Sequence, residues 1–262
     1  MYACVGDIST VMMRCPHRPG ERPKSCSDPA HAERLVAPGS YQVGVNRPLS
    51  SGYVGVVLIA EELLLLALDP VKGTVHLATR SDLHRAVALA LAAELAIGGR
   101  LSYEDKKLDV VPGEPPADPL LTEALGAISE RVGQGRKPMR VLGSLDKDLG
   151  GIWTRLIDRL VAGGTIVEEH HGVLPARHPV ADRALHAAVL SRVQAAAAAD
   201  GPLDSRDAVL LAYGLLCTLV DRVAPERSHR RHTIARMEEA VKVAPFAGIL
   251  RAMTETQFVP AV

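Results

Sequence analysis

The stretch Glu94–Val111, ELAIGGRLSYEDKKLDVV, contains the end of an apolar helix, two glycines and a short run of alternating apolar and polar residues. Glycine past a helix end adopts the left-handed backbone conformation that other residues resist, so Gly98-Gly99 predicts a helix C-terminus. The alternation that follows, interrupted by a polar turn, predicts a β-hairpin. The same pattern returns at Arg159–Leu174, RLVAGGTIVEEHHGVL. We therefore predict two helix–glycine–hairpin units.

The composition favours helices for the rest of the chain. Of the 262 residues 47% are hydrophobic but only 3% are aromatic, so the core must consist mainly of Leu, Val and Ala. Thirty basic and thirty acidic residues cancel, which argues against a globally basic nucleic-acid-binding protein. The four cysteines form no CxxC pair and match no structural zinc spacing. This usage indicates a reducing, cytoplasmic compartment, with Cys217 as a small core residue.

The N-terminal segment differs in composition from the rest. Residues 1–53 are rich in Pro, Gly, Ser and Arg and lack sustained periodicity. Such a segment cannot bury enough apolar surface to offset its ordering entropy. We predict that 1–53 is a disordered extension, or precedes the true start of the protein, and that 54–262 is the globular domain. The longest apolar run, Ala208–Val220, is shorter than the ~20 residues that span a bilayer, and the N-terminus lacks a signal-peptide pattern.

Within the domain, capping residues and apolar periodicity divide the chain into helices. Leu58–Leu68 is a Leu-rich helix. Ser81 or Asp82 is expected to cap the next helix, which is apolar nearly all round and therefore belongs at the centre of a bundle. Asp118-Pro119 is a strong helix start, and its helix should lead into a basic loop over 133–140. Further helices are expected at about 148–162, 182–199, 206–223, 227–243 and 246–256. The predicted fold is mainly α, a central helical bundle surrounded by amphipathic helices, with peripheral β-hairpins.

The sequence shows no catalytic motif. A GxSxG elbow, an HExxH helix, a P-loop and a complete GxGxxG are all absent. Glu94, inside an apolar helix, could act as a general acid, but such a carboxylate is more often paired, and Arg100 is the expected partner. His170-His171 lack a neighbouring carboxylate–His set, which favours an exposed turn over a metal site. We expect a protein that is not an enzyme and that holds no cofactor or metal.

Two basic groups are candidate binding sites. Arg80, His84 and Arg85 surround the start of the central helix, where backbone N–H groups and guanidinium forks both favour a phosphate. The second group is a basic loop, which can lie against an anionic membrane at about 1 kcal/mol per charge. This loop contains Arg131, Arg136, Lys137 and Arg140. For either group alone, a solvated surface is an equally good interpretation.

Four segments resemble a known family in their order and spacing. LLLLALDPVKG, AAELAIGGRLSYEDKKLDVV, DPLLTEAL and TRLIDRLVAGGTIVEEHHGVLPARHPV are similar to the Golgi phosphoprotein 3 family, in its bacterial branch, over about Leu58 to Thr254. The resemblance implies a helical fold around a central bundle with peripheral β-hairpins. Eukaryotic members are peripheral membrane proteins that bind phosphatidylinositol 4-phosphate and act as adaptors for Golgi trafficking and glycosyltransferase retention. The second hairpin takes part in self-association there, which implies a homo-oligomer contact through 165–174.

The resemblance also locates a headgroup pocket. The eukaryotic pocket uses a Trp and an Arg on the segment before ELAIGGR, and two Arg on the helix before the second hairpin. Counted from Glu94 and from Gly163-Gly164, these positions fall on Thr79, Ala88, Gly150 and Trp153, so none of the four is retained. Arg80, Arg85 and Arg155 each lie within about one helical turn of one of these positions and could together rebuild an anion site. The candidate headgroup-binding residues are Arg80, His84, Arg85, Trp153 and Arg155.

The main hypothesis is a non-catalytic, cytoplasmic, peripheral membrane or adaptor protein. It would bind phosphorylated lipid headgroups, such as that of phosphatidylinositol 4-phosphate, through its arginine surface. The alternative from the residues alone is a winged-helix DNA-binding protein, in which Arg155 and Arg159 flank a recognition helix. The acidic pair Glu168-Glu169 on that wing argues against phosphate contact, so no nucleic-acid partner is expected. A ligand-free protein-interaction scaffold is the third interpretation.

Overall fold

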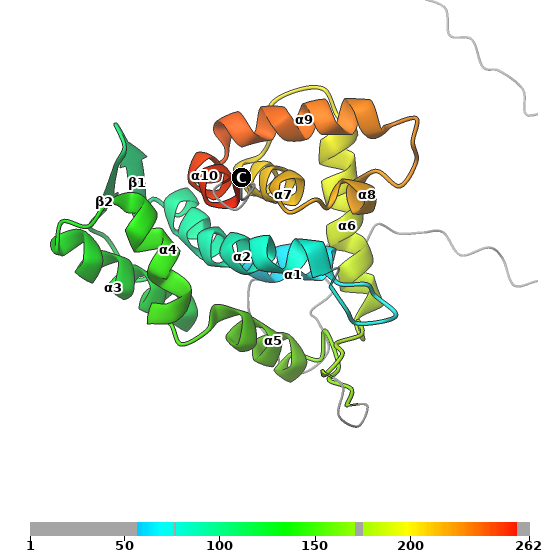
Figure 1. Cartoon of the computed structure of the whole chain (residues 1–262), viewed down its shortest axis with the longest axis horizontal. Coiled ribbons are helices and arrows are strands. Elements are labelled where there is room, and N and C mark those ends of the chain that lie inside the picture. Colours follow the sequence, from blue (N-terminus) through cyan, green and yellow to red (C-terminus); the bar gives the residue numbers. More distant parts are fainter. Residues whose placement is uncertain (1–56, 76, 171–174, 256–262) are drawn as a thin grey trace, which may run out of the picture. The chain divides into compact units, whose positions relative to one another are not determined.

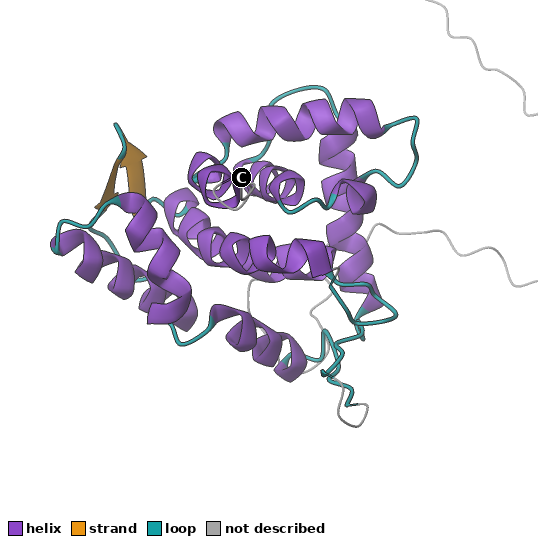
Figure 2. Cartoon of the chain, in the orientation of Figure 1, coloured by secondary structure: helices purple, strands orange, loops and turns teal. Residues whose placement is uncertain are grey.

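The structure is a computed structural model that describes residues 57–75, 77–170 and 175–255. Within these residues the fold is mainly α, with ten helices and one two-stranded antiparallel sheet, which confirms the predicted fold class (Figure 1 and Figure 2). The extension predicted over 1–53 lies outside the described residues. In chain order the elements are α1 (Ile59–Ala67), α2 (Leu77–Ile97), β1 (Leu101–Glu104), β2 (Lys107–Val110), α3 (Pro119–Gly133), α4 (Pro138–Asp148), α5 (Ile152–Ala162), α6 (Arg183–Ala198), α7 (Ser205–Leu216), α8 (Val220–Val223), α9 (Arg230–Val243) and α10 (Ala247–Glu255).

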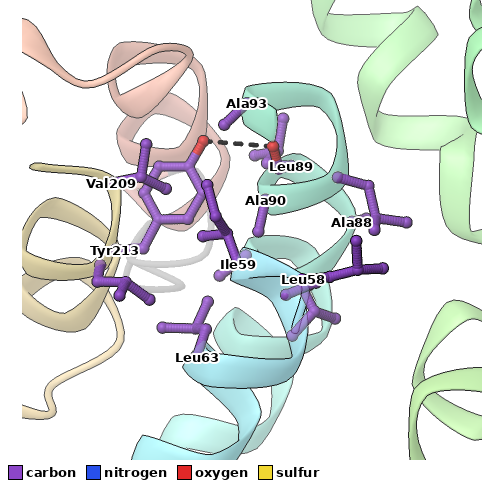
Figure 3. Close-up of a cluster of buried hydrophobic side chains, with 14 of the residues drawn as sticks. Leu58, Ile59, Leu63, Ala88, Leu89, Ala90, Ala93, Val209 and Tyr213 are labelled. Atoms are coloured by element: carbon purple, nitrogen blue, oxygen red, sulfur yellow. Dashed lines mark hydrogen bonds between the residues drawn. The ribbon is translucent and has the colours of Figure 1, made fainter. Parts of the chain in front are cut away.

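Helices α1 and α2 pack together in the core, and α7 contacts both (Figure 1). Every residue of α1 is buried. Its run of Leu leaves no polar face for water, and Glu61 and Glu62 in its first turn are buried in ion pairs. Residues 86–93 of α2 are all buried as well. Figure 3 shows Tyr213 of α7 in this core near Ile59, where its hydroxyl lies 3.5 Å from the Leu89 carbonyl and donates to the Pro245 carbonyl at 2.9 Å. The apolar helices therefore form the predicted central bundle.

The central helix begins earlier than predicted. Ser81 and Asp82 were expected at the N-cap, but α2 starts at Leu77 and contains both residues. Most helical stability in a protein comes from tertiary packing of an apolar face rather than from local signals. Because α2 packs against α1, its helical conformation does not require a side-chain cap at Ser81 or Asp82.

The first helix–glycine–hairpin unit is confirmed. Helix α2 ends at Ile97, Gly99 has a φ of +67°, and the N–H of Arg100 returns to the Leu95 carbonyl at 2.8 Å. Strands β1 and β2 pair in antiparallel register, with Leu101 opposite Val110. The polar turn between them has positive φ at both of its residues, the geometry that suits the twist of a two-residue hairpin.

The second unit begins as predicted and then differs. Helix α5 ends before Gly163, Gly164 has a φ of +69°, and residues 166–169 are extended. Their partners lie beyond the predicted hairpin, through single bridges from Ile166 to Val180 and from Glu169 to Arg177. No regular ladder forms there, since Pro179 lacks the N–H that would bond to the Val167 carbonyl. The N–H groups of His178 and Val180 bond instead to the Gly73 and Pro70 carbonyls of the α1–α2 turn. Residues 171–174 lie outside the described part, so self-association through 165–174 stays a prediction.

Residues with positive φ shorten one predicted helix and divide another. The helix expected at about 148–162 is α5, which begins only at Ile152, because Gly150 and Gly151 both have positive φ and separate it from α4. The predicted basic loop over 133–140 is therefore partly wrong, since α4 begins at Pro138. Similarly, the helix expected over 206–223 breaks at Thr218, which has a φ of +58°, into α7 and α8.

The remaining predictions of local structure agree with the fold. Asp118 caps α3 by accepting the N–H of Leu120 at 2.8 Å, and Asp182 caps α6. Cys217 is fully buried, as expected for a core residue. Across the described residues, none of the helices combines the length and the apolar character that crossing a membrane requires.

Candidate functional site

The candidate site lies where α2, α4, α5 and α10 approach one another. The imidazole of His84 on α2 stacks on the indole of Trp153 on α5, with ring centroids 4.4 Å apart and planes inclined by 18°. Both side chains are half-buried. Beside this stack, His84 and Arg85 line a pocket of about 160 Å³. Its other lining residues are Ala88, Leu142, Gly143, Asp146 and Met253. We call this cavity the His84 pocket.

Small residues and a methionine determine the shape of the His84 pocket. A Cβ at Gly143 would lie 2.8 Å from the terminal carbon of Met253, so glycine allows α10 to approach α4 here. Arg85 donates to the backbone carbonyl of Met253 at 3.1 Å, which places its guanidinium at this boundary. The pocket therefore has an apolar wall, an aromatic edge and a guanidinium group.

The charges at the pocket are partly balanced. Arg85 lies 3.7 Å from Asp82, one turn earlier on α2. Asp146 accepts the backbone N–H of Ile152 at 2.7 Å, so this carboxylate supports the start of α5. The guanidinium of Arg85 and the imidazole of His84 suit the binding of a polar, negatively charged group, and the Asp146 carboxylate in the lining opposes it. No nucleophile–base pair is present among the lining residues.

The structure brings three of the five predicted binding residues together. His84 and Arg85 line the pocket, and Trp153 contacts it only through its stack on His84. Arg80 lies one turn before His84 on α2, although its side chain is outside the described part. Arg155 does not line the pocket. Its guanidinium contacts Glu123 on α3 at 2.6 and 2.9 Å, because residues two apart on a helix face different directions.

Most of the buried charge lies elsewhere, in what we call the α1 ion cluster. Glu61 and Glu62 in the first turn of α1 are almost fully buried, so their charges require partners. Arg159 joins Glu61 at 2.9 Å to Asp118 at 2.8 Å. Glu62 accepts from Arg192 and Arg206, both at 2.8 Å. The cluster consists of Glu61, Glu62, Glu94, Asp118, Arg159, Arg192, Arg206 and Asp207.

Glu94 belongs to this cluster, and its predicted partner was wrong. It accepts the N–H of Ile59 at 2.8 Å and Nη1 of Arg206 at 3.0 Å, whereas Arg100 donates to the Val111 carbonyl. Burial raises the pKa of Glu94, against the effect of these two donors. Both carboxylate oxygens are thus engaged in holding α1 and α7 against α2, which is a structural role.

The same cluster argues against a DNA-binding surface on α5. A recognition helix would present Arg155 and Arg159 to the nucleic acid. Arg159 is instead bonded to Glu61 and Asp118, and Arg155 to Glu123. Sequence reasoning missed these pairings because the partners of Arg159 lie 98 and 41 residues away along the chain, and the partner of Arg155 lies 32 residues away.

Several lining residues of the His84 pocket also escaped the sequence analysis. Leu142, Gly143 and Met253 are ordinary apolar or small residues, and only Gly143 within an amphipathic helix hints at a close approach. Over the described ranges, no three His, Cys, Asp or Glu side chains are grouped so that they could hold a metal ion.

These features define a class of protein. It has a helical bundle with an apolar centre, charges paired around α1, and a small aromatic and cationic pocket at its edge. The chain belongs to the Golgi phosphoprotein 3 (GPP34) family, whose family model matches residues 59–256. The resemblance noted in the sequence is thereby confirmed, while its bacterial branch stays a prediction. A search of curated proteins gives no match. Family membership suggests a lipid-binding or adaptor role like that of Golgi phosphoprotein 3.

Proposed function

We propose that this protein is a non-catalytic, peripheral membrane or adaptor protein that binds a phosphorylated lipid headgroup at the His84 pocket. The observation that carries the proposal is the His84–Trp153 stack beside Arg85. Two of the positions that correspond to the family's headgroup pocket fall at this place, since Ala88 lines the pocket and Trp153 forms the stack. This correspondence of positions supports the proposal, with different side chains at the pocket.

The chemistry of these side chains fits a phosphorylated ring. A guanidinium can form two parallel hydrogen bonds to a phosphate. Among the described residues that line the pocket, Arg85 carries the guanidinium. The flat face of the stack provides apolar contact for the carbons of an inositol ring. Arg80, one turn earlier on α2, adds a second positive charge on the same segment. Phosphatidylinositol 4-phosphate is the ligand that family membership suggests.

A vesicle flotation assay tests this proposal. The protein is mixed with vesicles of neutral phosphatidylcholine, of phosphatidylcholine with phosphatidylserine, and of phosphatidylcholine with phosphatidylinositol 4-phosphate at matched charge. We expect the strongest binding to the phosphoinositide vesicles. Arg85→Ala should reduce it by about tenfold, because hydrogen bonds to charged groups contribute about 1.5–3 kcal/mol. Trp153→Ala should reduce it several-fold, because it removes the ring that holds His84 in place and an aromatic pair contributes about 0.5–1.5 kcal/mol.

Two control variants make the test specific. Arg155→Ala removes a predicted site residue that does not line the pocket, and Arg231→Ala removes an exposed cation on α9. Both should leave phosphoinositide binding unchanged. Equal binding to neutral and anionic vesicles, binding to neither, or wild-type phosphoinositide binding by Arg85→Ala would contradict the proposal.

A further inference from the structure

A compact basic surface lies at the junction of α3 and α4. Gly135, with a φ of +68°, turns the chain after α3, and Pro138 starts α4. We call Arg136, Lys137, Met139 and Arg140 the α4 basic surface. The three cations are exposed, and Met139 between them is 46% exposed. Figure 1 shows α4 packed beside α3 at this end of the bundle.

The positive charge of this surface is not neutralised within the described residues. No Asp or Glu occurs in the sequence between Glu130 and Asp146. Glu130 itself is exposed and accepts a hydrogen bond from Gln134. Arg131, which was predicted to join the basic loop, is engaged in a two-point contact with Asp148. By contrast, within the described ranges the side chains of Arg136, Lys137 and Arg140 take part in no ion pair or hydrogen bond.

The surface continues into the His84 pocket along one face of α4. Met139, Leu142, Gly143 and Asp146 follow one another at the spacing of a single helix face. The last three of these residues line the pocket. One helical turn, about 5.4 Å, therefore separates the exposed Met139 from the pocket lining. A binding partner with a flat surface can contact both at once.

We infer that the α4 basic surface docks the protein on an anionic lipid bilayer. The three cations would lie against negatively charged headgroups, and the Met139 side chain would enter the interface between headgroups and acyl chains. This inference shares with the proposed function only the presence of a membrane. It requires negative surface charge and no particular headgroup, and it orients the His84 pocket toward the bilayer.

A bilayer fits this surface better than a nucleic acid. Proteins that depend on backbone charge for nucleic-acid affinity neutralise about 6–10 phosphates, whereas this surface offers three cations within five residues. An exposed Met gains apolar burial in a membrane interface but gains little against a phosphate backbone. The charge and the apolar side chain therefore point to the same partner.

Vesicles that contain phosphatidylserine but no phosphoinositide separate this inference from the proposed function. A contribution of about 1 kcal/mol per cation corresponds to about fivefold in partitioning, so Arg136→Gln/Lys137→Gln/Arg140→Gln should bind about a hundredfold less tightly at low salt. Met139→Ala should bind a few-fold less tightly. Wild-type binding should weaken as salt is raised, because exposed charges are screened.

The matched control removes three other exposed cations, through Arg227→Gln/Arg231→Gln/Lys242→Gln. It changes the net charge equally and should retain nearly all binding. Both triple variants should keep the wild-type melting temperature. The single variants Arg136→Gln and Arg140→Gln should each weaken vesicle binding by about fivefold and perturb the fold less.

The outcomes that overturn the inference are distinct. Wild-type-like binding of the α4 triple variant would exclude the surface, and an equal loss in the control triple variant would assign the effect to net charge alone. Binding of random duplex DNA that depends on the α4 cations, without vesicle binding, would make the surface a nucleic-acid site instead.

Discussion

Replacing Glu62 by Gln tests whether the α1 ion cluster holds the central helix in place. The Glu62 side chain is 5% exposed and accepts three charge-assisted hydrogen bonds. Arg192 donates two of them, at 3.0 and 2.8 Å, and Arg206 donates the third at 2.8 Å. These bonds to Glu62 raise the pKa of Arg192. Glutamine keeps the shape of the side chain, but it removes the charge and turns an NH₂ group toward the guanidinium groups.

The expected cost follows from what remains around the two arginines. Removing one partner of a buried ion pair costs about 3–5 kcal/mol, because the other charge is left uncompensated. Here Arg192 keeps Asp207 and Arg206 keeps Glu94. The Arg192 side chain is also 39% exposed, so water replaces part of the lost interaction. We therefore expect Glu62→Gln to lower the free energy of unfolding by about 3 kcal/mol, the lower end of that range.

Urea unfolding followed by circular dichroism measures this change. With a slope of about 2 kcal/mol/M, the midpoint should fall by about 1.5 M. The control is Glu123→Gln, which removes a two-point contact with Arg155 at the surface and should leave the midpoint unchanged. A fall of less than about 0.3 M for Glu62→Gln, or an equal fall in the control, would refute the assigned role of the cluster.

Three further predictions concern single positions. Burial raises the pKa of Glu94 above that of an unfolded Glu, so the ionisation of Glu94 lowers stability as pH rises above about 4.3. Glu94→Gln should therefore flatten the fall of the urea midpoint with pH, and a pH curve parallel to that of the wild type would contradict this. A Cβ at Gly73 would lie 2.2 Å from the Pro179 nitrogen, so Gly73→Ala should lower the melting temperature more than Gly135→Ala. At Gly135 only the positive φ opposes a side chain, at about 1 kcal/mol, and equal losses in the two variants would contradict the packing argument. Burial raises the pKa of the Cys217 thiol, so peptide mapping should find it unalkylated until denaturant is added, and rapid alkylation would show that α7 opens.

Local signals in the sequence predicted much of the fold. The double glycine after α2, the cap at Asp118 and the Leu-rich α1 each act through groups within a few residues, so the chain itself records them. The prediction failed where several local outcomes compete. Gly150-Gly151 could have continued a helix or ended one, and only the two positive φ values show that it ends α4.

The candidate site was only partly predictable. His84 and Arg85 are neighbours on one helix, so their shared location follows from the sequence. That Trp153 stacks on His84 depends on the packing of α5 against α2, which no spacing records. The same holds for Arg155, whose position beside Trp153 in sequence suggested a common pocket, although the helix directs it to Glu123.

By itself, the sequence determined the helical class, the apolar centre, the glycine-ended helices and the family, because each rests on composition or on the order of short segments. Only the tertiary structure decided the partners of the buried charges, the lack of ion partners for the α4 basic surface among the described residues, and the wall of the His84 pocket. The physical reason is the same in each case. Burial and Coulomb energy depend on distances between groups that are far apart along the chain, and those distances exist only once the helices have packed.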